Sequence, residues 1–516
     1  MAQEKPMSEA YNGKGDEIAV DVGQSTELLD DNFGRKQELE RNFSIWSLIG
    51  AAFIGVPTWS VIVISLNLGI YQGGPALIIY GPISVAPFSL LISLSLAELA
   101  SMFPTTGGPQ EWSYRLGGRP GVFWSWLTAW ANLVGWAIGL PLVGIATSLS
   151  ITGLAVLYNP NYSPKTWHIF LIGEGCIAVG AIINIYGRKL VPLIDHIGFY
   201  WYFIVLLILV IVPISTADTK ATPEFVFKTF INSTGWSSDF VCYMTGLNFI
   251  AAAFIGIDSV THLAEEVPRP SVNLPRAIIL APIVGFIATF TMLVCIMFSI
   301  PADSFESILT SPIGYPLIQI VLNATESRTA SLIITLLVLY ISVQNIMNCC
   351  QISSRVIWSF ARDGGFIFPK FFREVHPTLA APVRAIYAVW AIGTVLMLLF
   401  LGCTSAFNAL TSAFVIMFHI TYCIPIVIFL LRRRTSPFTT GFPLGKFGFA
   451  INTIAVAYMM FTSVMFFLPG FMPVDGLNMN YAFGIVGVTA IIALTSWFIT
   501  GRENYLQDGA GVVISL

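Results

Sequence analysis

The pentapeptide Ala-Ala-Phe-Ile-Gly occurs at residues 51–55 and again at 252–256, each time inside a long apolar stretch. Val-Pro follows the first copy, and Ile-Asp follows the second. Glycine and proline interrupt helices, and an interrupted helix leaves backbone N–H and C=O groups without partners. In an apolar environment such groups must line a protein cavity, where they bind ions or small polar molecules. We therefore predict a binding site that includes Ala52, Gly55 and Gly256.

Asp258 is the most chemically distinctive residue near these interruptions. A charge inside an apolar stretch costs several kcal/mol unless it is paired, so such residues are usually functional. Its carboxylate is suited to receive the cationic head of an amine. As an alternative, Asp258 caps the second half of an interrupted helix, because Asp accepts from free backbone N–H groups. The two roles are compatible.

Three aromatic residues flank the interruptions: Phe53, Trp59 and Phe254. Their positions favour a role as walls and gates of a cavity, and the alternative is packing against lipid or neighbouring helices.

Two further apolar stretches carry polar or aromatic residues at helical spacing. They are Trp130, Asn132 and Trp136 in one stretch, and Tyr340, Gln344, Asn345 and Asn348 in the other. Polar residues in a membrane helix face the interior of the bundle, where they bind a ligand or hydrogen-bond to other helices. We predict that Trp136, Tyr340 and Asn345 contact the bound molecule, with helix–helix bonding as the alternative.

Acidic residues near the ends of two apolar stretches predict a gate. Glu98 ends one stretch, and Glu265 and Glu266 end another, with Arg115, Arg269 and Arg362 as candidate ion-pair partners. The alternative is that these charges are simply solvated at helix ends. Glu98, Glu265 and Arg362 are the predicted gating or coupling residues, and Glu98 is the first candidate for proton coupling. Asp195 and His196, at the start of a further stretch, are also able to titrate.

Composition shows what must position these residues. The chain has 516 residues, of which 55% are hydrophobic and 10% are charged, and the mean hydropathy is +0.77. About a quarter of the residues of a soluble protein are charged. Windows of roughly 20 apolar residues predict twelve membrane-spanning helices. They lie near 44–71, 75–98, 121–157, 167–187, 191–215, 240–264, 276–300, 328–360, 384–402, 406–431, 447–469 and 481–500.

The distribution of positive charge predicts the orientation. Of 25 Lys and Arg residues, only Lys165, Lys220, Lys228 and Arg328 fall on one face of the membrane under this assignment. Because cytoplasmic loops are rich in Lys and Arg, both termini are predicted to be cytoplasmic. Glycosylation sequons at Asn161, Asn232 and Asn323 fall on predicted outer loops, which is typical of a plasma-membrane glycoprotein.

The sequence carries no pattern typical of an enzyme. It has no His/Cys spacing for a metal, no phosphate-binding loop and no nucleophile elbow. We therefore predict no catalytic residue, no cofactor, no metal and no nucleic-acid partner. The predicted partners are a small-molecule amine or amino acid, a proton and membrane lipid.

The spans predict a domain organisation. It comprises a cytoplasmic tail at 1–42, a first five-helix repeat at 43–216, an extracellular loop at 217–238, a second five-helix repeat at 239–434, helices 11 and 12 at 435–501 and a cytoplasmic tail at 502–516. An odd number of spans in each repeat places the two repeats in opposite membrane orientations. The fold class is thus an all-α polytopic membrane protein with a 5+5 inverted repeat, interrupted helices 1 and 6, and two extra helices. Paired interrupted helices are typical of a transporter's binding site.

Several dispersed segments carry a resemblance to a known family. They include Ser95–Ser101 with Pro104 and Gly107-Gly108, Thr234-Gly235-Trp236, Asp258 with Thr261–Val267, Trp358–Gly364, Leu444–Phe449 and Asn478–Tyr481. With these segments the chain resembles the fungal amino acid/choline permeases of the amino acid–polyamine–organocation superfamily, and choline permeases in particular. The resemblance implies two inverted five-helix repeats, a substrate site at the bilayer midplane and alternating access.

The chain departs from the family pattern at both interruptions. Family members usually have a Gly-x-Gly type break in the first helix, where this chain has the pentapeptide. Choline permeases carry an aromatic residue near Ala252, which is small here. A missing ring weakens cation–π attraction to a quaternary ammonium by about 0.5–2 kcal/mol.

These features predict a secondary active transporter that imports a small cationic or zwitterionic nitrogen compound at the plasma membrane. Choline or a related amine is the first choice, with proton coupling. The alternatives are a γ-aminobutyrate, polyamine or amino-acid permease, and a non-transporting nutrient sensor.

Overall fold

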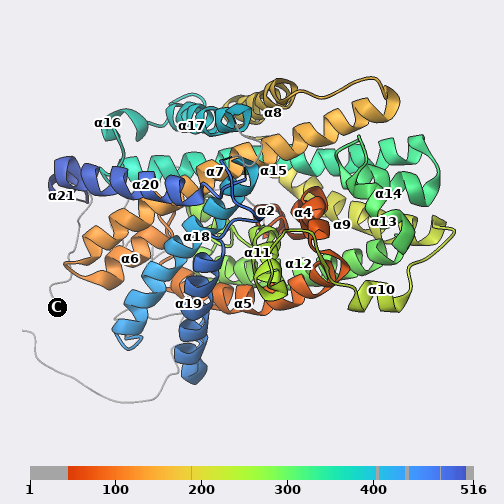
Figure 1. Cartoon of the computed structure of the whole chain (residues 1–516). Coiled ribbons are helices and arrows are strands. Elements are labelled where there is room, and N and C mark those ends of the chain that lie inside the picture. The colour runs from red at the N-terminus through yellow and green to blue at the C-terminus, as the bar shows by residue number, and fades with distance from the viewer. Residues whose placement is uncertain (1–44, 188, 403–405, 436–440, 477, 507–516) are drawn as a thin grey trace, which may run out of the picture. The chain divides into compact units, whose positions relative to one another are not determined.

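The computed structural model describes residues 45–187, 189–402, 406–435, 441–476 and 478–506, and these are almost entirely helical (Figure 1). The predicted tail at 1–42 and most of the tail at 502–516 lie outside the described residues. The predicted domain boundaries stay predictions.

The elements of the first half follow in chain order. They are α2 (Ile45–Gly55), α3 (Thr58–Ile64), α4 (Leu66–Tyr71), β1 (Gln72–Gly73), α5 (Gly74–Met102), α6 (Pro109–Gly117), α7 (Gly121–Tyr158), α8 (Thr166–Tyr186), α9 (Val191–Thr216), α10 (Pro223–Lys228), β2 (Ile231–Asn232), α11 (Asp239–Ala253) and the 3₁₀ helix η1 (Ser259–Glu266).

The second half contains mainly long helices. Its elements are α12 (Pro270–Phe298), η2 (Ala302–Ser304), α13 (Phe305–Leu309), α14 (Pro316–Thr325), α15 (Arg328–Arg362), α16 (Pro369–Phe372), α17 (Val383–Gly402), α18 (Ala406–Leu431), η3 (Gly445–Phe447), α19 (Gly448–Met465), α20 (Ala482–Ser496), the π-helical turn η4 (Trp497–Gly501) and α21 (Arg502–Asn504).

Ten helical segments among the described residues are long and apolar enough to cross a membrane. They contain α5, α7, α8, α9, α12, α15, α17, α18, α19 and α20. Each corresponds to a predicted span. The other two predicted spans, 44–71 and 240–264, are interrupted: the first is divided into α2, α3 and α4, and the second into α11 and η1. The protein is therefore a polytopic helical membrane protein.

Helix α7 lies at the centre of the helix packing and is buried along most of its length. It contacts α15 and α18, while α5 runs alongside α12 (Figure 1). Helices α8 and α17 contact each other and expose more of their apolar surface, and α20 is the least buried spanning helix. The short antiparallel pair β1–β2, with Gln72 opposite Asn232, connects the end of α4 to the segment before α11.

The first interruption has a local cause in Pro57. Proline has no N–H to donate and disfavours helical geometry at the residue before it. The N–H of Val56 still bonds to the carbonyl of Ala52 at 2.9 Å, after which α2 ends and α3 restarts at Thr58.

The second interruption has its cause in Gly256, whose φ of +85° lies in the left-handed region that glycine adopts readily. Helix α11 ends at Ala253, and the chain resumes as η1 only at Ser259. The carbonyl that the break frees at Phe254 accepts a hydrogen bond from the Ser89 hydroxyl of α5, at 3.2 Å. A neighbouring helix thus supplies the partner that lipid cannot.

Candidate functional site

The two interruptions meet through their glycines. A Cβ on Gly256 would lie 2.3 Å from the carbonyl oxygen of Gly55, and a Cβ on Gly55 would lie 2.4 Å from the hydroxyl oxygen of Ser259. Neither position has room for a side chain. The repeated pentapeptide therefore brings two backbones from distant parts of the chain into direct contact.

A cavity opens beside this contact and encloses about 740 Å³ of empty space, including its open mouth. Its lining comes from the first interruption and from α7, α11, α15 and α18. The lining residues are Gly55, Pro57, Ser60, Val61, Ile64, Ser65, Trp136, Gly139, Leu142, Val143, Ala146, Phe249, Ala252, Ser342, Asn345, Cys349, Phe407, Thr411 and Phe414.

The chemistry of this central cavity is aromatic and uncharged. Trp136, Phe249, Phe407 and Phe414 contribute rings, and the described residues of its lining include no Asp, Glu, Lys or Arg. Hydroxyl and amide groups are supplied by Ser60, Ser65, Ser342, Asn345 and Thr411. Such a cavity can hold a small organic cation through ring faces and fix it with a few hydrogen bonds.

A second, more polar cavity adjoins the first and shares Phe249 with it. Its lining includes Gln72, Asn248, Ser412 and Asn480. Phe249 therefore belongs to the lining of both cavities. The loop that contributes Asn480 is on the predicted extracellular side.

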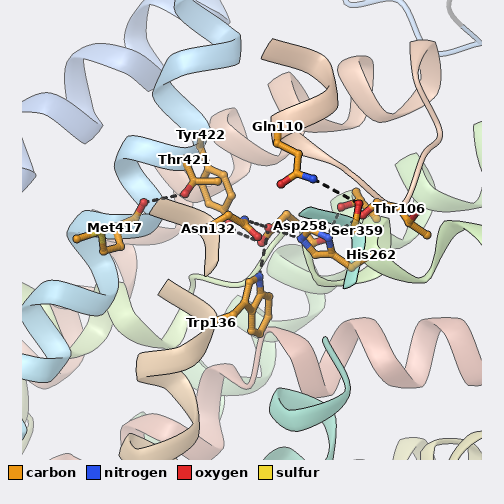
Figure 2. A network of polar contacts seen from close by, with 11 residues as sticks. Thr106, Gln110, Asn132, Trp136, Asp258, His262, Ser359, Met417, Thr421 and Tyr422 are labelled. Carbon is orange, nitrogen blue, oxygen red and sulfur yellow. Dashed lines mark hydrogen bonds and ion pairs between the residues drawn. The ribbon is translucent and has the colours of Figure 1, made fainter. Parts of the chain in front are cut away.

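Asp258 lies next to the central cavity, fully buried and surrounded by hydrogen-bond donors (Figure 2). Oδ2 accepts from Nδ2 of Asn132 at 2.6 Å and from Nε1 of Trp136 at 3.3 Å, and it lies 3.0 Å from Nε2 of His262. Oδ1 accepts from the Tyr422 hydroxyl at 2.6 Å. These partners come from α7, η1 and α18, so the carboxylate connects three helices at the second interruption.

The Asp258 network continues toward the end of the bundle predicted to be cytoplasmic. Nδ1 of His262 lies 3.0 Å from the backbone carbonyl of Thr106. The Thr106 hydroxyl donates to Glu265 at 2.9 Å, and Arg362 donates to the same carboxylate oxygen at 2.8 Å. A continuous hydrogen-bonded path therefore links Trp136, in the cavity wall, to the Glu265–Arg362 ion pair.

Among the residues described, no group of three or more His, Cys, Asp or Glu side chains could hold a metal ion. The geometry thus combines an uncharged aromatic cavity with a separate buried polar network.

The model for the amino acid permease family matches residues 43–491, which is most of the chain. This chain belongs to the amino acid permease family. It is a multi-pass membrane transporter and not an enzyme, and the resemblance in its sequence motifs is confirmed.

Known relatives of this permease carry different substrate names. The choline transporter of Saccharomyces cerevisiae is 31% identical over 476 residues, covering 90% of this chain and 83% of the relative. The amino-acid permease BAT1 of Arabidopsis thaliana is 27% identical, covering 95% of this chain and 97% of the relative. The 7-keto 8-aminopelargonic acid transporter of Saccharomyces cerevisiae is 26% identical, covering 88% of this chain and 91% of the relative.

Three of the predicted substrate-binding residues, Gly55, Trp136 and Asn345, line the central cavity. Ala252, the small residue near the position where choline permeases carry an aromatic residue, also lines it. Asn345 also accepts a bond from the Cys349 thiol. The predicted residues Ala52 and Gly256 are absent from the lining: Ala52 is buried in α2, and Gly256 lies against the Gly55 carbonyl.

The predicted aromatic walls have other neighbours in this structure. Phe53 packs against Phe199, Tyr202 and Phe203 of α9, and Trp59 lies 4.9 Å from the Tyr202 ring, centroid to centroid. Phe254 is buried, and none of the three lines the cavity. Aromatic pairs contribute about 0.5–1.5 kcal/mol beyond the burial of their area, which favours this packing of Phe53 and Trp59.

The stripe on α15 is divided between two roles. Tyr340 stacks edge-on against Trp201 of α9 and is not a cavity residue. Gln344 donates to the Ile194 carbonyl at 3.1 Å, and Asn348 donates to Asp195 at 2.9 Å. These bonds join α15 to α9, so the helix–helix alternative describes this face.

The interpretation of Asp258 as a helix cap is wrong. Asp258 does precede η1, but its side chain makes no capping bond to the backbone of η1. Its oxygens are already bonded by side chains from α7, α18 and η1. Asp258 is not among the residues that line the cavity.

The predicted gate forms only partly with the expected partners. Glu265 pairs with Arg362, as the sequence suggested, but Arg115 pairs with Glu111 at 2.6 Å. Glu98 pairs with Arg434 at 2.7 Å, which sequence reasoning did not consider. Arg434 follows α18, far from Glu98 in sequence, so no local spacing identifies it.

Sequence reasoning also missed several functional candidates. His262 follows Asp258 by four residues, a spacing that places both on one helical face and was available as a signal. Tyr422, Phe249, Phe407 and Phe414 lie in continuous apolar stretches, where no pattern separates a cavity-facing ring from a packed one.

Proposed function

We propose that this permease is a secondary active transporter that imports a small cationic or zwitterionic nitrogen compound, with choline or a related amine as the first choice. The observation that carries the proposal is the uncharged central cavity, with rings of Trp136, Phe249, Phe407 and Phe414 in its wall. Each ring can attract a quaternary ammonium by about 0.5–2 kcal/mol.

Although Ala252 is small, α11 still contributes a ring to this cavity. Phe249 lies three residues earlier on the same helix, and residues three apart are neighbours on a helix surface. Its ring can replace the aromatic residue that choline permeases carry near Ala252. Ser342, Asn345 and Thr411 are available for the hydroxyl group of choline. The similarity to the yeast choline transporter supports the same choice.

Alternating access is the proposed mechanism. Phe249, which lines both the central cavity and the polar cavity on the predicted extracellular side, is the proposed barrier on that side. The pairs Glu265–Arg362 and Glu266–Arg355 lie toward the predicted cytoplasmic side. Opening one of these barriers at a time would carry a substrate across. The fold proposed with it has twelve spans, an inverted repeat, two cytoplasmic termini and a plasma-membrane location, with a proton as the coupling ion.

The second candidate is a permease for γ-aminobutyrate, a polyamine or an amino acid. The similarity to amino-acid permease BAT1 favours it. A carboxylated substrate would need hydrogen-bond donors for its anion, and Ser60, Ser342, Asn345 and Thr411 in the cavity wall can supply them. The uncharged lining favours the first candidate.

The test is ligand-induced stabilisation of the full chain purified in detergent. Choline, betaine, carnitine, γ-aminobutyrate, polyamines and the common amino acids are compared by thermal unfolding. A ligand at a hundredfold excess over its Kd stabilises the folded state by about 2.7 kcal/mol. We expect choline to stabilise the protein. Stabilisation by a carboxylated amine and not by choline would select the second candidate.

A cavity variant sharpens this test. Phe414→Ala removes one ring and should raise the Kd for choline by roughly 2- to 30-fold. Phe400→Ala on α17 is the control, because Phe400 is buried and does not line the cavity. An unchanged Kd in Phe414→Ala would contradict the aromatic site.

A further inference from the structure

Asp258 and His262 form a buried acid–base pair beside the central cavity. We propose that this pair is the protonation site through which the permease couples substrate movement to proton movement. The inference rests on the proposed function, and it replaces Glu98 as the coupling site. Three features carry it: a proton held within the pair, a contact with the cavity wall and a contact with the ion pair toward the predicted cytoplasmic side.

The first feature follows from the hydrogen bonds of His262. Its Nδ1 lies 3.0 Å from the carbonyl oxygen of Thr106, and its Nε2 lies 3.0 Å from Oδ2 of Asp258. A carbonyl oxygen only accepts, so Nδ1 must carry a hydrogen. The contact with Asp258 then holds a second hydrogen, on Nε2 or on the carboxyl. The pair therefore contains one proton shared between two titratable groups.

The second feature is the bond from the cavity wall. Trp136 lines the cavity with its ring and donates its indole N–H to Asp258. A further proton on Oδ2, the oxygen that Asn132, Trp136 and His262 contact, turns that oxygen into a donor, so at least one of these N–H groups must change partner. Asn132 can accommodate that change, because its amide oxygen is buried and has no hydrogen-bond partner among the described residues. Rotating this amide would present the oxygen to the new carboxyl hydrogen.

The third feature is the contact with Thr106. Loss of the shared proton would leave a nitrogen lone pair of His262 facing either the carboxylate or the Thr106 carbonyl, and one of these contacts would break. Thr106 also bonds through its hydroxyl to Glu265 and lies 3.3 Å from Arg362. Loss of the proton therefore changes the hydrogen bonds next to the Glu265–Arg362 pair, whereas gain of a proton changes those of Trp136.

Among the described residues, the charged groups on the elements around the pair are themselves paired or are exposed. Glu265 and Glu266 of η1 are paired with Arg362 and Arg355 of α15. Helix α18 contributes the Tyr422 hydroxyl, which already donates to Asp258. Helix α2 carries no titratable side chain, α7 has only Tyr158 at its far end, and Arg276 of α12 is exposed.

The inference is tested by comparing choline accumulation driven by a pH gradient with choline counterflow in the absence of a gradient. The full chain is reconstituted in liposomes, with radiolabelled choline as the probe. Counterflow is measured at equal pH on both sides, and accumulation is measured with a gradient of one pH unit, acidic outside. One coupled proton then drives roughly tenfold accumulation. The ratio of the two activities is compared between wild type, His262→Gln and a matched control, so a general loss of activity cancels.

The control is Asp195→Asn, since Asp195 is also a fully buried carboxylate but lies on α9 away from the cavity. We expect the gradient effect in wild type and in Asp195→Asn, and its loss in His262→Gln. A gradient effect retained in His262→Gln would overturn the inference, as would a wild type that exchanges choline without any gradient effect. A wild type without choline counterflow would instead overturn choline as the substrate.

An infrared measurement decides the inference without transport or substrate. The detergent-purified protein is acidified, and the band of a protonated carboxyl group is recorded. Because other Asp and Glu side chains contribute to this band, the Asp258 component is obtained by subtracting the Asp258→Asn spectrum from the wild-type spectrum. Asp258→Asn should lose one component, Asp195→Asn should lose a different one, and the Asp258 component should titrate at a different pH in His262→Gln. Identical spectra for wild type and Asp258→Asn would overturn the inference even if choline is transported.

Discussion

The two helix interruptions begin with the same five residues and reach different chemical environments. At the first, Gly55 and Pro57 line the central cavity, and the surrounding rings come from α9. At the second, Gly256 does not line the cavity, and Asp258 is hydrogen-bonded to four side chains. The shared pentapeptide lets two backbones approach closely, while the residues that follow it determine what each interruption does.

Because of this difference, the residues that line the substrate cavity are separate from the buried carboxylate. The described residues of the cavity wall at the first interruption include no Asp, Glu, Lys, Arg or His, so a cationic substrate meets ring faces and hydroxyls. The buried carboxylate is held one layer behind, and Trp136 belongs to both regions because its ring lines the cavity and its N–H bonds to Asp258. A change in either region therefore reaches the other through a single side chain.

The largest expected effect distinguishes the two glycines. Gly256→Ala would place a Cβ 2.3 Å from the Gly55 carbonyl at a φ of +85°. Backbone strain and overpacking together should lower the free energy of unfolding by about 3–5 kcal/mol. Gly55→Ala meets the Ser259 side chain, so we expect a loss of about 1–3 kcal/mol. Unfolding in SDS micelles measures both, and equal losses would contradict this asymmetry.

The sequence predicted the membrane class, the helical segments and the positions of both interruptions, because these depend on local hydrophobicity and on Gly and Pro. It also predicted that Trp136, Asn345 and Gly55 belong near the site. It did not predict the Glu98–Arg434 pair or the donation from Tyr422 to Asp258, since both join residues more than 160 positions apart. Such contacts depend on helix packing, which hydrophobic periodicity does not determine.

The aromatic residues show the same limit at closer range. Phe53 and Phe249 both lie on helices that end at an interruption, and both were equally available as cavity walls. Phe53 packs into α9, whereas Phe249 lines two cavities. A helix that is apolar on all sides has no polar face, so its sequence does not show which of its rings faces the substrate. The packing of the neighbouring helices determines this.

The next comparison uses one tyrosine at each interruption. The Tyr422 hydroxyl donates to the Asp258 carboxylate at 2.6 Å, and the Tyr202 hydroxyl lies 2.8 Å from the neutral hydroxyl of Thr58. Hydrogen bonds to charged groups contribute about 1.5–3 kcal/mol and neutral ones about 0.5–1.5 kcal/mol. Tyr422→Phe should therefore destabilise more than Tyr202→Phe in the same unfolding assay. The reverse order would indicate that Asp258 is uncharged in the purified protein.

The smallest expected effect concerns a hydroxyl between the interruptions. Ser259 is buried, its hydroxyl has no hydrogen-bond partner among the described residues, and it faces Gly55. Removing an unpartnered hydroxyl should be neutral or stabilising by up to about 1 kcal/mol. Ser259→Ala is thus expected to unfold no more easily than wild type. Ser89→Ala, which removes the bond to the Phe254 carbonyl, should lose about 1 kcal/mol.

Combining two of these changes measures how closely the interruptions are coupled. Ser259→Gly removes the atoms that a Cβ at Gly55 would meet at 2.4 and 2.6 Å, so it should relieve part of the loss caused by Gly55→Ala. A coupling energy of about 0.5–3 kcal/mol between the two changes is typical of residues in contact. If the changes in unfolding free energy of the two variants simply add, the two helices separate when Gly55 is enlarged. The close backbone contact would then not be needed for stability. A favourable coupling would instead show that this contact persists and that only the side chain of Ser259 limits it.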